Sequence, residues 1–154
     1  MLERHEIRRR IIATHSQSEP SPRPPRNTNP EKSAAIEKLA AQAAQYALEK
    51  KGEDVKLFDL RKLTAITDFF LICTGSTDTH VRAIADHIVD SFENEDMKPW
   101  HVEGRGRAQW VLVDYVDFVV HVFDPQTREY YGLERLWGDA ECLEFREETL
   151  SPLE

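Results

Sequence analysis

The chain contains few cysteines and lacks any long apolar run. Cysteine occurs at two of the 154 positions, Cys73 and Cys142, and neither a disulfide framework nor the paired spacing of a zinc site is present. No apolar stretch approaches the roughly 20 residues that a membrane-spanning helix requires. The run Ile11-Ile12-Ala13 is also too short for the apolar region of a secretory signal. These shortages predict a protein of a reducing compartment, with the cytoplasm as its expected location.

Positive charge is scarce in most of the chain. Residues 1–30 carry six Arg and three Glu, a net charge of +3, whereas residues 31–154 carry 14 Lys and Arg against 25 Asp and Glu, a net charge of −11. An acidic domain is repelled by the phosphate backbone of nucleic acids. The composition therefore disfavours direct binding of DNA or RNA by residues 31–154, and it favours a basic protein as the partner.

Proline is concentrated near the N-terminus. Five of the eight prolines lie in residues 1–30 among Ser, Arg and Asn, and this composition predicts a disordered Pro- and Arg-rich extension. A solvated tail is favoured, while an organellar transit peptide and a basic arm that touches RNA stay open. Glu3, Glu6 and Glu19 argue against a transit peptide, since such peptides are poor in acidic residues. We expect one folded domain over residues 31–143 and an acidic C-terminal tail over residues 144–154.

Helix-start signals and apolar spacing predict a domain that mixes helices and strands. Asn29-Pro30 suits the start of one helix and Asp124-Pro125 the start of another. The expected order is a helix over 30–51, strands near 55–60 and 69–73, a helix from Thr77 or Asp78, a strand near 98–103, a hairpin over 109–113 and 118–123, and a helix over 125–137 that is punctuated by Gly132. We therefore predict an α/β (α+β) fold, with a small mixed sheet of about five strands flanked by helices.

The Gly75-Ser76 turn lies between an apolar strand and a helix, where unpaired N–H groups could hold a phosphate. A nucleotidyltransferase would also need two metal-binding carboxylates, normally spaced Asp-x-Asp. The nearest pair, Asp114 and Asp117, has the wrong spacing and is better suited to a turn. The turn is therefore interpreted as architecture, with an enzyme that binds a nucleoside triphosphate as the alternative.

The histidines do not form a metal-binding pattern. His80 and His87 are seven residues apart, whereas two ligands on one helix would be three or four apart. His101 and His121 fall on separate predicted strands, so a structural role is favoured for His121, although the fold could bring these two together. We predict no metal and no cofactor.

The segment 128–137 carries more apolar groups than one narrow helical stripe can bury. Helical spacing predicts that Tyr130, Leu133 and Trp137 share one face, while Tyr131 turns away. Core packing is favoured for Leu133. For Tyr131 and Trp137 a partly exposed contact role is as well supported, because exposed aromatics beside acids suit a surface that binds a basic protein.

Six blocks of sequence, in this order, are similar to one known family. They lie at residues 66–75, 80–86, 102–104, 110–115, 119–123 and 128–137. Together they resemble the ribosomal silencing factor S family, also called Iojap-like, over roughly residues 33–143. The resemblance implies a nucleotidyltransferase-like scaffold without catalysis, which agrees with the missing metal carboxylates.

The resemblance also implies a partner. Members of the family bind the large ribosomal subunit through ribosomal protein L-fourteen and sterically block association with the small subunit, which lowers translation when nutrients are limiting. Some members form homodimers, so a homodimer is possible. The residues expected to form the contact face are Trp110, Asp114, His121, Arg128, Tyr131, Leu133, Glu134, Leu136 and Trp137. Tyr131→Ala or Trp137→Ala is expected to weaken ribosome binding at least about tenfold while the domain stays folded.

Overall fold

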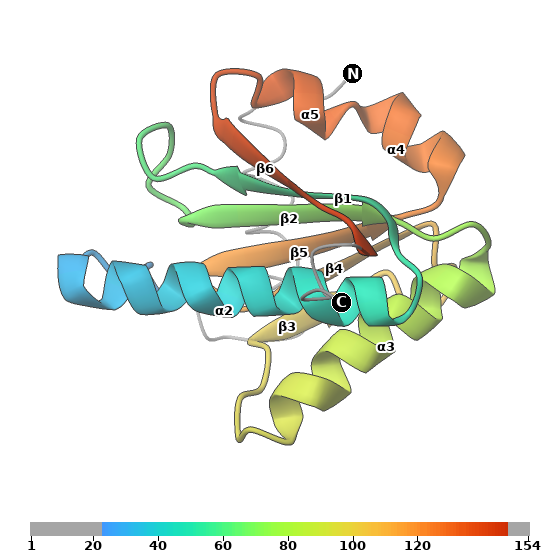
Figure 1. The fold of residues 1–154 in the computed structure, drawn as a ribbon, viewed down its shortest axis with the longest axis horizontal. Coiled ribbons are helices and arrows are strands. Elements are labelled where there is room, and N and C mark those ends of the chain that lie inside the picture. Colours follow the sequence, from blue (N-terminus) through green and yellow to red (C-terminus); the bar gives the residue numbers. More distant parts are fainter. Residues whose placement is uncertain (1–22, 148–154) are drawn as a thin grey trace.

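The fold is a six-stranded mixed sheet with helices on both faces, seen here in a computed structural model that describes residues 23–147 (Figure 1). Predictions about residues 1–22 and 148–154 lie outside the described residues. The strands are β1 (Glu53–Asp59), β2 (Phe69–Thr74), β3 (His101–Glu103), β4 (Trp110–Asp114), β5 (Phe118–Phe123) and β6 (Glu141–Phe145). Their order is β3-β4-β5-β2-β1-β6. The predicted fold class is confirmed, with six strands in place of about five.

The sheet combines one parallel pair with four antiparallel pairs. Strands β2 and β5 pair in parallel. The chain between them passes through helix α3 (Asp78–Glu93), β3 and β4, and it returns to the end of the sheet at which β2 begins. Strands β4 and β5 form the predicted antiparallel hairpin. The hairpin connection has three residues, 115–117, where four were expected.

Strand β2 shows how the core is divided. All six of its residues are buried, which confirms the prediction of a central strand covered on both faces. Phe69, Leu71 and Cys73 point into the larger core, beneath α2 (Pro30–Glu49) and α3. Phe70 and Ile72 point into a smaller core, beneath α4 (Pro125–Tyr131) and α5 (Leu133–Leu136). Figure 1 shows the two helix layers on opposite sides of the sheet.

The predicted helix starts are confirmed by their capping bonds. In each case a side-chain oxygen accepts a hydrogen bond from a backbone N–H in the first helical turn: Asn29 for α2, Thr77 for α3 and Asp124 for α4. The predicted punctuation of the last helix at Gly132 is confirmed, because this residue adopts a left-handed conformation (φ 60°) that divides the helix into α4 and α5. No helix within residues 23–147 is long and apolar enough to cross a membrane.

Strand β6 was not predicted from the sequence. Its five residues pair with β1 at the edge of the sheet, and four of them are exposed, so the segment carries no buried apolar face that a pattern could reveal. The strand extends past residue 143, which was expected to end the domain.

Residues 23–29, for which disorder is predicted, contact the domain. Arg23 and Arg26 form ion pairs with carboxylates of the domain, which hold this part of the extension against the sheet.

Candidate functional site

The Gly75-Ser76 turn is built for packing. The Ser76 N–H donates to His80 Nδ1 at 2.8 Å, and His80 Nε2 in turn donates to the Lys50 carbonyl at 2.7 Å. A Cβ atom at position 75 would lie 2.7 Å from the Val81 nitrogen, so glycine is required for this close approach of strand and helix. A donor that could have held a phosphate is therefore already engaged within the protein.

The Asp114 side chain supports the hairpin turn, as predicted, whereas the Asp117 side chain bonds to the segment before α2. The buried Asp114 carboxylate accepts a hydrogen bond from the Val116 N–H at 2.7 Å. Asp117 accepts one from the Asn27 N–H at 2.6 Å. Within residues 23–147 no group of three His, Cys, Asp or Glu side chains is arranged to hold a metal ion.

His121 is a buried structural histidine, as predicted. Its Nδ1 accepts a hydrogen bond from the Trp110 indole N–H at 3.0 Å, and its ring packs edge-on against Phe70. His101 lies two strands away on β3, opposite Asp114, so the sheet does not bring the two histidines together. Trp110 and His121 stabilise each other inside the smaller core.

The predicted contact face divides into buried and accessible residues. Six of its nine side chains are at most 7% exposed: Trp110, Asp114, His121, Arg128, Leu133 and Trp137. Buried side chains of this kind present little surface to a partner. The partly exposed members are Tyr131, Glu134 and Leu136.

Tyr130 has a large exposed side chain, but it was not predicted to belong to this face. It is 70% exposed, whereas Leu133 and Trp137 are buried, so the prediction that these three share one helix face is wrong. The left-handed Gly132 interrupts the helix and breaks the angular relation between residues before and after it. The predicted punctuation at Gly132 is therefore the signal that could have separated Tyr130 from the core.

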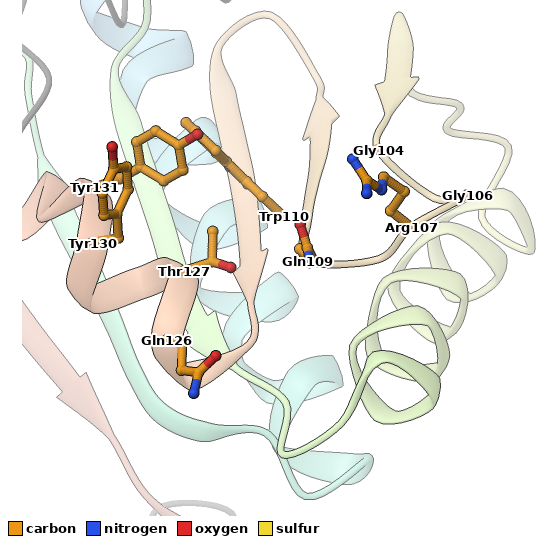
Figure 2. A pocket seen from close by; sticks show the side chains of 9 residues that line it. All are labelled: Gly104, Gly106, Arg107, Gln109, Trp110, Gln126, Thr127, Tyr130 and Tyr131. Carbon is orange, nitrogen blue, oxygen red and sulfur yellow. The ribbon is translucent and has the colours of Figure 1, made fainter.

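An aromatic groove lies between α4 and the loop that precedes β4 (Figure 2). Its volume is about 730 Å³. The described lining residues are Gly104, Gly106, Arg107, Gln109, Trp110, Gln126, Thr127, Tyr130 and Tyr131. The Tyr131 ring packs on Trp110 with centroids 4.7 Å apart, and Tyr130 stands edge-on to Tyr131 at 5.0 Å. Arg107 lies across from the tyrosines and is the one charged residue among those described.

An acidic hollow lies on the other side of α4. Its volume is about 410 Å³, and its described lining residues are Glu53, Asp54, Thr74, Pro125, Arg128, Glu129, Gly132, Glu134 and Arg135. Four of these are acidic and two are arginines, so the hollow is negatively charged overall. Helical spacing explains the two sides, because residues 126, 127, 130 and 131 face the groove while 125, 128, 129 and 132 face the hollow.

Arg128 joins the walls of the acidic hollow. Its guanidinium donates to the Asp54 carbonyl at 2.9 Å and to the Thr74 hydroxyl at 2.7 Å. It also pairs with both carboxylate oxygens of Glu134, at 3.2 and 2.7 Å. This buried arginine therefore fixes α4 and α5 against the ends of β1 and β2.

We expect Glu134→Gln to lower the free energy of unfolding near neutral pH and to lose that effect in acid. The hydrogen bond from Arg128 lowers the pKa of Glu134 below its ordinary value of 4.5, with a smaller contribution from Lys56. The ionised carboxylate therefore stabilises the folded state fully above pH 4.5, and this stabilisation is lost as the pH falls through the lowered value.

Urea unfolding at several pH values measures the effect. Glu144→Gln is the matched control, because Glu144 also pairs with an arginine but is exposed to solvent. A difference between wild type and Glu134→Gln that stays constant from neutral to acidic pH would contradict the assignment.

Comparisons with known proteins agree with one another. A family model described as "Ribosomal silencing factor during starvation" matches residues 32–153. The ribosomal silencing factor RsfS of Bacillus subtilis is 43% identical over 69% of this chain and 87% of its own length. The chloroplastic protein Iojap of Zea mays is 32% identical over 72% of this chain and 48% of its own length. A crystal structure of a Bacillus halodurans protein superposes with a TM-score of 0.60 at 35% identity, and it covers 73% of this chain and 99% of the other. This chain belongs to the ribosomal silencing factor family, as its sequence blocks indicated.

Proposed function

We propose that this chain binds the large ribosomal subunit through ribosomal protein L-fourteen and sterically blocks association with the small subunit. The observation that carries the proposal is the surface of α4 and α5. There the exposed Tyr130 stands between an aromatic groove and an acidic hollow. A surface of this kind offers stacking to aromatic or guanidinium groups and charge pairing to lysine or arginine of a basic ribosomal protein.

Charge favours a protein partner over ribosomal RNA. The net charge of −11 over residues 31–154 repels the RNA that surrounds any ribosomal protein. The same charge accelerates encounter with a basic protein patch. The contact face of the proposal therefore consists of Tyr130, Tyr131, Glu134 and Leu136.

No chemistry is needed for this function, because a rigid domain at the subunit interface excludes the other subunit by its volume. Family membership supports a regulatory role of this kind. The alternative, an enzyme that grips a nucleoside triphosphate at Gly75-Ser76, gains no support from a turn whose Ser76 N–H is bonded to His80. The proposed location is the cytoplasm, with an organelle as the alternative if residues 1–30 act as a transit peptide.

Sucrose-gradient sedimentation of purified ribosomal subunits tests the proposal. Adding the protein in excess to large subunits before the small subunits is expected to reduce the peak of assembled ribosomes, with the protein in the large-subunit peak. The Tyr130→Ala variant, added in the same way, is expected to reduce the peak of assembled ribosomes less than the wild-type protein does. An unchanged assembled peak despite protein bound to large subunits would reject the blocking mechanism, and absence of the protein from that peak would reject binding.

A further inference from the structure

The segment that precedes α2 runs along one end of the sheet. Residues 23–29 lie outside the family match, which begins at residue 32. They end at Asn29, whose side chain caps α2, so the segment is continuous with that helix. Three of its residues contact the loops at the starts of β2 and β5, which are neighbouring parallel strands.

Arg23 makes the deepest of these contacts. Its guanidinium pairs with both oxygens of Asp114, with Nε–Oδ2 and Nη2–Oδ1 distances of 2.8 and 3.0 Å. It also donates to the carbonyls of Ile66 and Val116, each at 2.9 Å. Four of its five N–H groups are thereby used. The side chains of Arg23 and Asp114 are 8% and 0% exposed, so a buried carboxylate receives its counter-ion from the extension.

Arg26 and Asn27 repeat the pattern a few residues later. Arg26 pairs with Asp68, a carboxylate that is 1% exposed. The Asn27 N–H donates to Asp117 at 2.6 Å. Burial raises the pKa of Asp68, and the charge of Arg26 opposes this rise. Each contact thus supplies a positive or polar partner to an acidic side chain near the same end of the sheet.

The sequence Arg23-Pro24-Pro25-Arg26 explains how the segment reaches both sites. Proline fixes φ near −65° and restricts the preceding residue to extended conformations. A polyproline II segment has three residues per turn, so residues three apart point to the same side. Arg23 and Arg26 are three apart and both face the domain. The prolines that suggested disorder also reduce the entropy lost when this segment is ordered.

We infer that residues 23–29 form a strap that is an integral part of the folded domain, with Arg23 as the buried counter-ion of Asp114. The folded unit then includes residues 23–29, which precede the start of the family match. The strap holds the β4–β5 turn against the loop before β2, because one guanidinium bonds to both. This inference does not depend on ribosome binding.

Amide hydrogen exchange of the full chain tests the strap. In Arg23→Ala, exchange of the Val116 and Asp68 amides is expected to rise at least about tenfold, since their bonds lie at the strap. The Gly75 amide, at the other end of β2, is the internal reference. Arg105→Ala is the matched control, because Arg105 pairs with Asp86 through the same fork but is 53% exposed. A rise in Arg23→Ala no larger than in Arg105→Ala overturns the inference.

Two further variants separate geometry from charge. Arg23→Lys keeps the positive charge but loses the planar fork, so its exchange is expected to lie between wild type and Arg23→Ala, and it remains informative if Arg23→Ala fails to fold. An amide exchange rate in Arg23→Lys equal to that of the wild type would refute the role given to the fork.

The double variant Arg23→Ala with Asp114→Asn removes both charges, and its effect on amide exchange is expected to be smaller than the sum of the two single effects. Additive effects would refute the counter-ion role.

Discussion

Tyr130→Ala is expected to weaken binding to the large ribosomal subunit at least about tenfold, with little change in the stability of the domain. The side chain is 70% exposed and contacts the Tyr131 ring edge-on, so its removal leaves no cavity in the core. Large aromatic side chains that become buried on association commonly dominate binding energy. Cosedimentation with large subunits at increasing protein concentration measures the change in affinity.

Two controls make this result specific. Tyr130→Phe keeps the ring and is expected to retain most of the affinity. Leu143→Ala removes another large exposed apolar side chain among residues 23–147, 57% exposed on β6, and is expected to bind as wild type does. Equal cosedimentation of Tyr130→Ala and wild type would exclude Tyr130 from the contact face.

Tyr131→Ala is also expected to weaken binding to the large subunit. Because the Tyr131 ring covers Trp110, the effect of this substitution on stability must be measured alongside.

Local sequence signals were sufficient for most of the fold. Asn29, Thr77 and Asp124 cap their helices because short polar side chains accept hydrogen bonds from the first turn, which depends on neighbours only. The apolar run at 69–73 became a strand covered on both faces. Strand β6 was missed because an exposed edge strand is specified by its pairing with β1, a contact far away in sequence.

The candidate site was less accessible to sequence reasoning. Large or charged side chains in the family-like blocks were assigned to a surface, yet Arg128, Asp114 and His121 are buried with their partners. Burial of a polar residue depends on a partner supplied by another element, such as Trp110 for His121 or Arg23 for Asp114. Nothing within a few residues of a polar side chain indicates such a partner, so spacing alone could not separate core from contact surface.

Trp137 illustrates the consequence, because its truncation is expected to destabilise the domain by about 3–5 kcal/mol. The side chain is 5% exposed and packs edge-on against Phe70 at 5.9 Å, in the smaller core with Leu133. Removing an indole from such a site loses its transfer free energy and leaves a cavity under α5. The sequence reading expected Trp137→Ala to stay folded and to lose ribosome binding directly, whereas its burial points to a loss through unfolding.

Urea unfolding of Trp137→Ala distinguishes these two causes, with Trp100→Ala as the control at a partly exposed tryptophan. The transition midpoint is expected to fall much further for Trp137→Ala than for Trp100→Ala. Trp137→Phe retains an aromatic ring, so it is expected to recover much of the stability and, with it, ribosome binding. A Trp137→Ala protein with wild-type stability that no longer cosediments with large subunits would instead place this side chain in the contact. Since α5 carries Leu136 on the proposed face and Leu133 in the core, the same experiment tests whether that face depends on the packing beneath it.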